Sequence, residues 1–548
     1  MNVRTLICLC LISFSLFADD SVKGRILLTA NQDISSAIHL YRHYRVDHGD
    51  DETLLNQLAL QVIQKGFKEG DESAILALFG AGISTHEATL SLFAEALRSP
   101  VPQQQLLAIH FLGLSRDRLA ERLLLQSQGS PYLAIRLKGA LLLAQHSNPQ
   151  ALEIAETLMA KAPHETKSLF PPLFAAIPGT RAKDALRRLM QHTSSDVRVS
   201  AIISAAAYQR EDLLPQIRSL ALHPDPRQKE ACAYALGALE DETSIPLLKK
   251  LLKRPQNSIQ VAAALSLHQL HDPEGKKHLM ELASQGEPLA IISLSKVTGS
   301  EDLLSHIASK GDDEQKCNAL LALLARDDPR CYPAITDLLA SSHRDRALIS
   351  LSSPAGTITT WKPLEAAYAK LANKPELREK SLQQQEKIIL ASLELPEPIF
   401  LKIALFLIQN QENTLIPALF HCLENHATPN AIALLKQCHQ LLGAPLIRQY
   451  ALLALCRLDE GEEYKRELSE WISQHHDQPL IQFRPSIVDA EGDYTLTPQE
   501  TSRFLIEAYE LIVQRRDAES LGILLDALEN GHLKNRYVLA GFLLRALE

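Results

Sequence analysis

A 31-residue repeat is the feature of this 548-residue sequence that most constrains its fold. Its clearest copy is DPRQKEACAYALGALED, from Asp225 to Asp241, where small apolar residues lie between two acids. With Asp225 as position 1, equivalent segments begin at Gly70, Val101, Tyr132, Pro163, Ser194, Asp225 and Gln256, and looser copies begin at Gly286 and Asp312. A fixed period of roughly 20–50 residues is typical of stacked repeat proteins, so the sequence predicts an array of similar units.

Two columns of the repeat place small and apolar residues on one helix face, because positions 8 and 12 are one helical turn apart. Position 8 is occupied by Ala77, Ala108, Gly139, Phe170, Ala201, Cys232 and Ala263, and position 12 by Ala81, Leu112, Leu143, Phe174, Ala205, Leu236 and Leu267. Position 17 carries Asp117, Asn148, Asp241 and Asp272, residue types that cap helix N-termini. A second amphipathic segment follows each time, so each unit is predicted to be a helix hairpin that buries its apolar faces by stacking on its neighbours.

The repeated segment resembles the HEAT repeat, particularly the short bacterial variety related to phycobilisome-lyase repeats. That family's pattern runs roughly Asp-Pro-x-Val-Arg-x-Ala-Ala-x-x-Ala-Leu-Gly. It is matched here by Asp225, Pro226, Ala231, Ala235, Leu236 and Gly237, and in the preceding copy by Val197, Arg198 and Ala201. The resemblance covers about residues 70–340 and implies an all-α, right-handed α-solenoid (superhelix). It implies no single function, because the family includes scaffolds, adaptors and a few enzymes.

The tetratricopeptide array is the structural alternative to this interpretation. Its period is about 34 residues and its repeats carry a Trp-Leu-Gly-Tyr pattern. Neither feature is found in the sequence, which therefore favours HEAT-like repeats.

The beginning of the sequence predicts export. Arg4 precedes an apolar run from Leu6 to Phe17, which is too short to span a bilayer and fits the apolar region of a signal peptide. Ala18 is the residue expected before the cut. The alternative is an N-terminal helix buried in the fold. A chain with such a signal peptide is expected to be periplasmic or secreted, and to come from a bacterium.

The repeat divides the chain into five expected segments. They are a signal peptide at 1–18, an N-terminal helical cap at 19–69, the HEAT-like array at 70–340, a loop or irregular break at 341–375, and a divergent helical region at 376–548. The break is expected because residues 351–363 are rich in Ser, Thr and Pro. The last segment continues the array or forms a separate domain.

Composition narrows the chemistry that the chain can perform. The formal net charge of −9 argues against a general nucleic-acid binder, which needs a basic face. The eight cysteines include no CxxC pair and no metal-ligand spacing, so mostly free, buried thiols are expected. No Gly-rich phosphate loop and no G-x-S-x-G elbow occurs.

Two His-Glu pairs invite comparison with deoxyhypusine hydroxylase, a HEAT-like enzyme whose His-Glu pairs bind two irons. They are His86-Glu87 and His164-Glu165. A shared metal site needs such pairs at equivalent positions of facing repeats. The two pairs are 78 residues apart, which is not a multiple of 31, so we expect them not to converge and predict no metal site or cofactor.

Residues 489–500 resemble an EF-hand calcium loop. Asp489, Glu491, Asp493 and Glu500 occupy loop positions 1, 3, 5 and 12 and form a weak calcium candidate. Tyr494 stands where the loop needs glycine. The alternative is a capping box from Thr497 to Glu500 that opens a helix, and the two interpretations are compatible.

A partner-binding surface is expected on the concave face, which the first helix of a HEAT repeat generally lines. Positions 6 and 10 would face solvent there, yet they carry apolar residues in several repeats, which suggests a groove for an amphipathic or extended partner. The predicted binding residues are Leu106, His110, Leu137, Leu141, Val199, Ile203, Tyr234, Val261 and Leu265. The alternative is that tight curvature packs these columns against neighbouring repeats.

The sequence therefore predicts an exported, non-catalytic scaffold or adaptor that binds a protein partner on its concave face. A lyase-like HEAT enzyme acting on a bound chromophore or peptide is the first alternative, and it needs clustered polar residues on that face. The second alternative is a structural component of an envelope complex.

Overall fold

The computed structural model describes residues 22–340, 346–354, 356–363, 375–483 and 496–548. The predicted signal peptide at 1–18 and three of the calcium candidates, Asp489, Glu491 and Asp493, lie outside these residues. The described residues form an all-α repeat architecture of stacked helix hairpins, with one small sheet. The fold class expected from the 31-residue period is confirmed.

The predicted repeat boundaries coincide with helix starts. Gly70, Val101, Ser194, Asp225 and Gln256 are each the residue that caps the N-terminus of a helix. The helices that begin the repeats, called motif helices below, are α4 (Asp71–Ser84), α6 (Pro102–Leu114), α8 (Leu133–Gln145), α10 (Pro171–Ala176), α12 (Ser195–Ala207), α14 (Pro226–Ala238), α16 (Asn257–Gln269), α18 (Pro288–Ser293) and α20 (Asp313–Leu324). In the fourth repeat a 3-10 helix, η3 (His164–Leu169), precedes α10, because two prolines begin the α-helical part.

Each motif helix is followed by the second helix of its hairpin. These second helices are α5 (Leu90–Ala96), α7 (Arg118–Gln126), α9 (Ala151–Lys161), α11 (Thr180–Met190), α13 (Leu214–Leu220), α15 (Ile245–Leu251), α17 (Pro273–Ser284), α19 (Glu301–Lys310) and α21 (Ala334–Leu339). Short 3-10 turns accompany several of them: η1 (Glu87–Thr89), η2 (Ser127–Gly129), η4 (Glu211–Leu213), η5 (Glu242–Ser244), η6 (Leu294–Lys296) and η7 (Pro329–Cys331).

Many of the motif helices end at a residue that is not glycine and yet adopts the left-handed backbone conformation. Position 16 of five repeats is occupied by Ser147, Gln209, Glu240, His271 and Asp327, whose φ angles are 60°, 52°, 52°, 61° and 56°. The next amide then bonds back to a carbonyl near the helix end, as Asp241 N does to Leu236 O at 3.0 Å. This bond reverses the chain toward the second helix of the hairpin.

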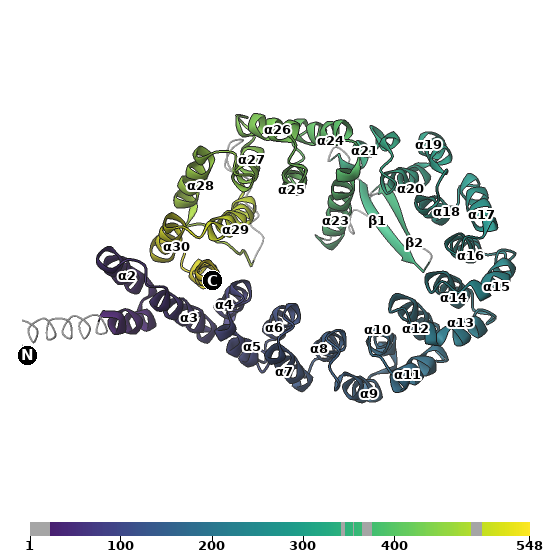
Figure 1. The fold of residues 1–548 in the computed structure, drawn as a ribbon, viewed down its shortest axis with the longest axis horizontal. Coiled ribbons are helices and arrows are strands. Elements are labelled where there is room, and N and C mark those ends of the chain that lie inside the picture. The colour runs from purple at the N-terminus through teal and green to yellow at the C-terminus, as the bar shows by residue number, and fades with distance from the viewer. Residues whose placement is uncertain (1–21, 341–345, 355, 364–374, 484–495) are drawn as a thin grey trace, which may run out of the picture. The chain divides into compact units, whose positions relative to one another are not determined.

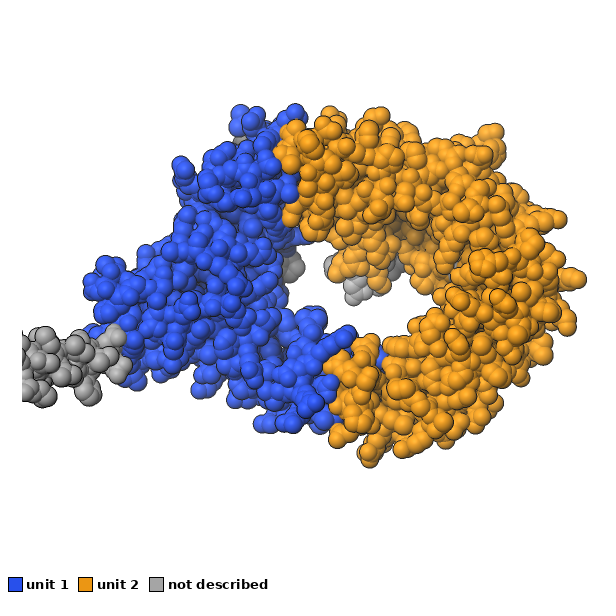
Figure 2. All heavy atoms as spheres, in the orientation of Figure 1, with its two compact units in different colours: residues 1–142, 435–548 blue, residues 143–434 orange. Residues whose placement is uncertain are grey.

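The chain forms two compact units, which are described separately (Figure 2). Unit 2 comprises residues 143–434 and contains the most regular repeats. Its motif helices line the inner side of an arc and the second helices line the outer side (Figure 1). After α21 the helical pattern resumes with α23 (Pro375–Ala391), η9 (Ser392–Glu394), α24 (Glu397–Gln409), α25 (Ile416–His426) and α26 (Pro429–His439), the last of which crosses into unit 1.

The expected irregular break at 341–375 contains a β-hairpin instead. Strands β1 (Arg346–Ser353) and β2 (Gly356–Pro363) pair antiparallel, with Ser350 opposite Thr359. The prediction of a loop was wrong because it weighed Ser and Pro as turn residues. The Thr-Ile-Thr-Thr run of β2 is instead rich in β-branched residues, which favour strands. The hairpin packs through β2 on α18 and α20 and through β1 on α23.

Unit 1 contains both terminal parts of the chain, residues 1–142 and 435–548. Its N-terminal helices are α2 (Ile34–His48) and α3 (Glu52–Glu69), followed by α4 to α8, and residues 22–32 are also helical. Its C-terminal helices are α27 (Pro445–Arg457), α28 (Glu462–His475), α29 (Pro498–Arg515), α30 (Ala518–Asn530) and α31 (Asn535–Leu547).

The last helix of the chain packs against the early helices α3 and α4. The contact is close because glycines meet there: a Cβ atom at Gly80 would overlap the main-chain oxygen of Tyr537, and one at Gly541 would overlap that of Gly80. The Tyr537 hydroxyl also donates to the Glu69 carboxylate. The N-terminal segment, expected to be an end cap, is therefore itself covered by the C-terminal helices.

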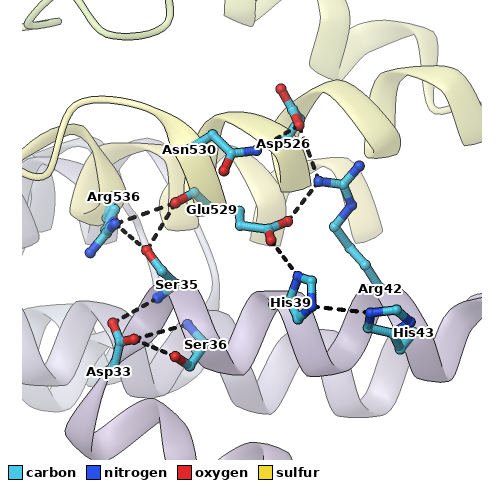
Figure 3. A network of polar contacts seen from close by, with 10 residues as sticks. All are labelled: Asp33, Ser35, Ser36, His39, Arg42, His43, Asp526, Glu529, Asn530 and Arg536. Carbon is cyan, nitrogen blue, oxygen red and sulfur yellow. Dashed lines mark hydrogen bonds and ion pairs between the residues drawn. The ribbon is translucent and has the colours of Figure 1, made fainter.

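A polar network joins the same two termini through α2 and α30 (Figure 3). The Glu529 carboxylate accepts from Arg42 Nη1 at 2.6 Å and lies 2.7 Å from His39 Nδ1. Arg42 also donates to Asp526 at 3.1 Å, and the Ser35 hydroxyl donates to the main-chain oxygen of Glu529 at 2.9 Å. Because these partners are almost 500 residues apart in sequence, no local pattern could have predicted the contact.

Candidate protein-binding surface

The predicted binding residues of unit 2 lie on three consecutive motif helices. Val199 and Ile203 on α12 and Tyr234 on α14 are half-buried, so part of each side chain faces solvent. Val261 and Leu265 on α16 are 0% and 1% exposed. For these two residues the alternative applies, because packing within the array encloses them, and they offer no surface to a partner.

The predicted binding residues of unit 1 are more accessible. Leu106 on α6 is 48% exposed and His110, one turn later, is also exposed. The His110 ring packs edge-on against Phe111, with centroids 5.3 Å apart. Leu137 and Leu141 on α8 are half-buried. The apolar side chains of Leu106, Leu137 and Leu141 on α6 and α8 are therefore partly open to solvent.

Ionic contacts between successive repeats hold the motif helices of unit 2 in register. Arg198 of α12 donates to Asp225, the cap of α14, at 2.8 Å and to Gln228 at 2.6 Å. Both the Arg198 and the Asp225 side chains are largely buried. A buried charge pair with further hydrogen bonds fixes geometry, so α12 and α14 present their inner faces as one rigid surface.

A second set of contacts recurs exactly one repeat apart. Arg218 donates to both carboxylate oxygens of Asp241, at 2.7 and 2.6 Å, and Lys249 pairs with Asp272 at 2.9 Å. From the sequence these two acids are expected only to cap helix N-termini. Asp272 does cap a helix, by accepting from Glu274 N, whereas Asp241 makes no such bond to the main chain. The periodic basic residue 23 positions earlier was the signal that could have revealed the pairs.

Of the two acids Asp241 and Asp272, Asp241 has the carboxylate that its surroundings stabilise more strongly. It is 4% exposed, and burial by itself raises its pKa. Hydrogen bonds from Arg218, Ser244 and Thr243 outweigh the burial and lower the pKa from 3.8 to about 2. The group is therefore ionised throughout the physiological range and acts as a structural anchor.

The β-hairpin lies on the inner side of unit 2, beside the motif helices α18 and α20 (Figure 1). Asn318 on α20 is completely buried and bonds the main chain of β2. Its Nδ2 donates to Thr359 O at 2.9 Å, and its Oδ1 accepts from Thr359 N at 2.9 Å. The inner face thus already holds one extended segment of the chain itself.

The two His-Glu pairs have local roles in the structure. His86 Nδ1 accepts from Ala88 N at 3.2 Å and so caps η1. His164 lies beside His192, with ring centroids 5.0 Å apart. Within the part of the chain that the structure describes, no three His, Cys, Asp or Glu side chains are grouped to hold a metal ion.

Glu500 is the residue of the calcium candidate that the structure describes, and it helps to cap the N-terminus of α29. Thr497 and Glu500 form a capping box at α29, in which Thr497 N donates to Glu500 Oε2 at 2.8 Å and Glu500 N donates to the Thr497 hydroxyl at 3.3 Å. The capped helix start is confirmed. Calcium binding stays a weak prediction, because the other three residues are not described.

The thiols of the described residues are buried and unpaired, as expected. They are Cys232, Cys317, Cys331, Cys422, Cys438 and Cys456. Burial raises the pKa of each, to about 12 in Cys317, Cys422 and Cys438. A thiol that stays protonated is a poor nucleophile, so these residues act as small apolar packing groups.

None of the helices in the described part of the chain combines the length and the apolar character needed to cross a bilayer.

Comparisons with known proteins identify the repeat. A family model of HEAT repeats matches residues 182–268 and, overlapping them, 223–294. A search of curated proteins gave no match. One similar solved structure comes from a study of a phosphorylation switch that controls the interaction between cadherin and beta-catenin; the alignment covers 94% of this chain and 100% of that chain, at 14% identity and a TM-score of 0.20. Residues 182–294, at the regular centre of the array, match the family's repeats, and this part of the chain consists of HEAT repeats.

Proposed function

We propose that this protein is a non-catalytic scaffold that binds a protein partner on the inner face of its repeats. The observation that carries the proposal is the half-buried apolar strip formed by Val199, Ile203 and Tyr234 on α12 and α14. Partly exposed aliphatic and aromatic side chains on a concave, rigid surface suit an amphipathic or extended partner.

The ionic contacts between repeats support a binding role for this strip. Side chains on a rigid surface lose little freedom when a partner docks, which lowers the entropic cost of association. Arg198, the residue before Val199 in the sequence, provides that rigidity through its ion pair with Asp225. HEAT repeats themselves imply no activity, so the proposal rests on the surface.

The test compares two aspartate variants in cross-linking and mass spectrometry from the native cells. Ile203→Asp places a charge in the strip, whereas Leu222→Asp changes a leucine of the same unit that is 67% exposed and belongs to neither column. We expect a partner that is recovered with the wild type and Leu222→Asp and is lost with Ile203→Asp. Recovery of the same proteins with all three chains would contradict the proposal.

We also propose that the protein is exported, on the basis of the apolar run from Leu6 to Phe17 behind Arg4. The mature chain should then begin at Asp19. N-terminal sequencing of the protein purified from its cells tests this directly, because an intact Met1 or Asn2 terminus would contradict cleavage.

A further inference from the structure

Two histidines on α2 bring their ring nitrogens together in unit 1 (Figure 3). His39 and His43 are one helical turn apart, so both rings project from the same face of the helix. Their Nε2 atoms lie 3.1 Å apart, and the rings meet edge to face with centroids 4.6 Å apart. The His39 side chain is 58% exposed and His43 is exposed as well, so packing in a core does not account for the pair.

The separation of the two nitrogens suits adjacent ligands of one divalent transition ion. Metal–imidazole bonds of about 2.0–2.1 Å place two ligand atoms roughly 3.3 Å apart at a tetrahedral centre and roughly 2.9 Å apart at a square-planar one. The observed distance between the two Nε2 atoms lies between these values. Two histidines one turn apart on a helix are also the spacing with which His-Glu-x-x-His helices hold zinc.

Glu529 on α30 fixes the tautomer of His39. Its Oε1 lies 2.7 Å from His39 Nδ1, and an ionised carboxylate can only accept, so Nδ1 carries the proton and Nε2 keeps its lone pair. The carboxylate is itself held in place, because its Oε2 accepts from Arg42 Nη1 at 2.6 Å. Metal-binding histidines almost always donate their other N–H to such a partner. His39 is therefore already oriented as a metal ligand.

The surroundings of the pair favour a cation and admit water. The polar network around it contains three carboxylates, those of Asp33, Asp526 and Glu529, and two guanidinium groups, those of Arg42 and Arg536. Within the described residues no third His, Cys, Asp or Glu side chain is grouped with the pair, so water must supply the remaining ligands. Structural zinc sites use four protein ligands, and a site with two holds its ion less tightly.

We propose that His39 and His43 form an exchangeable binding site for a divalent transition ion such as Zn²⁺ or Cu²⁺, with water in the other coordination positions. The ion replaces the hydrogen bond between the two rings, and the proton on His43 Nε2 moves to Nδ1. A metal-bound imidazole donates more strongly from its other nitrogen, so the ion strengthens the bond from His39 to Glu529. Binding thus clamps α2 to α30. The inference is independent of the proposed partner-binding function.

The first experiment titrates full-length proteins with Zn²⁺ by calorimetry. His39→Gln and His43→Gln each remove one ligand and keep a polar side chain on an exposed helix face. The matched control is His306→Gln, because His306 is an exposed histidine of α19 with no second histidine one turn away. Mg²⁺ serves as the control ion, since it prefers oxygen ligands.

We expect the wild type and His306→Gln to bind Zn²⁺ equally, and each ligand variant to bind at least about tenfold more weakly. Mg²⁺ should not compete. Equal binding by all four proteins, or no saturable binding of Zn²⁺ by the wild type, would overturn the proposal.

Electron paramagnetic resonance of the Cu²⁺ complex identifies the ligands directly. At less than one ion per chain, the spectrum should show splitting from two nitrogens in the wild type and from one in His43→Gln. Splitting from a single nitrogen in the wild type would contradict a shared ion. Glu529→Gln should keep the two-nitrogen spectrum and weaken Zn²⁺ binding about tenfold, because only the positioning of His39 changes. Unchanged affinity would refute the role of Glu529.

Hydrogen exchange tests the clamp. Saturating Zn²⁺ should slow exchange of the α30 amides in the wild type and leave them unchanged in His43→Gln. Because α30 contains no histidine, slower exchange there reports the bond from His39 to Glu529 rather than coordination within α30. If Zn²⁺ binds while exchange in α30 stays the same, the ion does not join the two helices.

Discussion

Replacing Asp241 by asparagine should destabilise the centre of the array in a way that depends on pH. Asparagine keeps the size of the side chain and removes the charge that Arg218, Ser244 and Thr243 stabilise. Lowering of the pKa from 3.8 in the unfolded chain to about 2 in the fold corresponds to about 2 kcal/mol of stability at neutral pH. Arg218 is 37% exposed and can return to water, so we expect the loss to stay near that value.

The sign of the pH dependence follows from the direction of the pKa shift. Because the folded pKa lies below the unfolded one, the contribution of Asp241 is complete above about pH 4 and is lost as the pH falls toward 2. The wild type should therefore lose more stability across this window than Asp241→Asn. At pH 2 the two proteins should differ little.

The assay is hydrogen exchange followed by mass spectrometry on residues 226–251, because repeat arrays open locally and one global midpoint is not well defined for them. The control is Asp196→Asn, which removes an ion pair with Arg227 whose two side chains are 65% and 66% exposed. Such a pair contributes about 0–1 kcal/mol. If Asp196→Asn cost as much as Asp241→Asn, or if the difference at Asp241 persisted at pH 2, the electrostatic argument would be refuted.

Three further predictions concern packing. Gly541→Val should loosen the contact of α31 with α4 and speed proteolysis of the last helix, while Gly24→Val, where a Cβ atom meets nothing within 4 Å, should leave it unchanged. Leu265→Asp should reduce helicity by circular dichroism because it buries an unpaired charge, at a cost of several kcal/mol, whereas Ile203→Asp should keep the wild-type spectrum. Cys232 should react with a thiol reagent only after denaturation, because it is completely buried; fast labelling of the native protein would contradict the packing.

The repeat architecture was predictable from sequence because it depends on local signals that recur. The N-terminal caps at Ser194, Asp225 and Gln256 each fall at the expected position 1. The left-handed residues that end the same helices were not predictable, because Gln209 and Glu240 give no sign of that conformation. There the reversal of the chain and the stacking of the next helix impose the backbone geometry.

The candidate surface was predictable only in part, for a related reason. A column of apolar residues in a repeat identifies a helix face, but it does not reveal whether the face is covered. Ile203 and Leu265 occupy the same position of their repeats, yet the first is half-buried and the second is enclosed. Which side chains stay accessible depends on packing between repeats and on the hairpin, which the sequence pattern alone does not encode.

In unit 1 the packing of the two terminal parts of the chain takes the place of separate capping repeats. A stacked repeat protein usually exposes an apolar face at each end and needs polar capping repeats to cover it. Here α31 lies against α3 and α4, and Gly80 and Gly541 bring the helices close enough for their main chains to touch. The chain leaves unit 1 at residue 142 and returns to it at residue 435. Joining the termini thus replaces capping, and it makes the stability of the first repeats depend on the last helix of the chain.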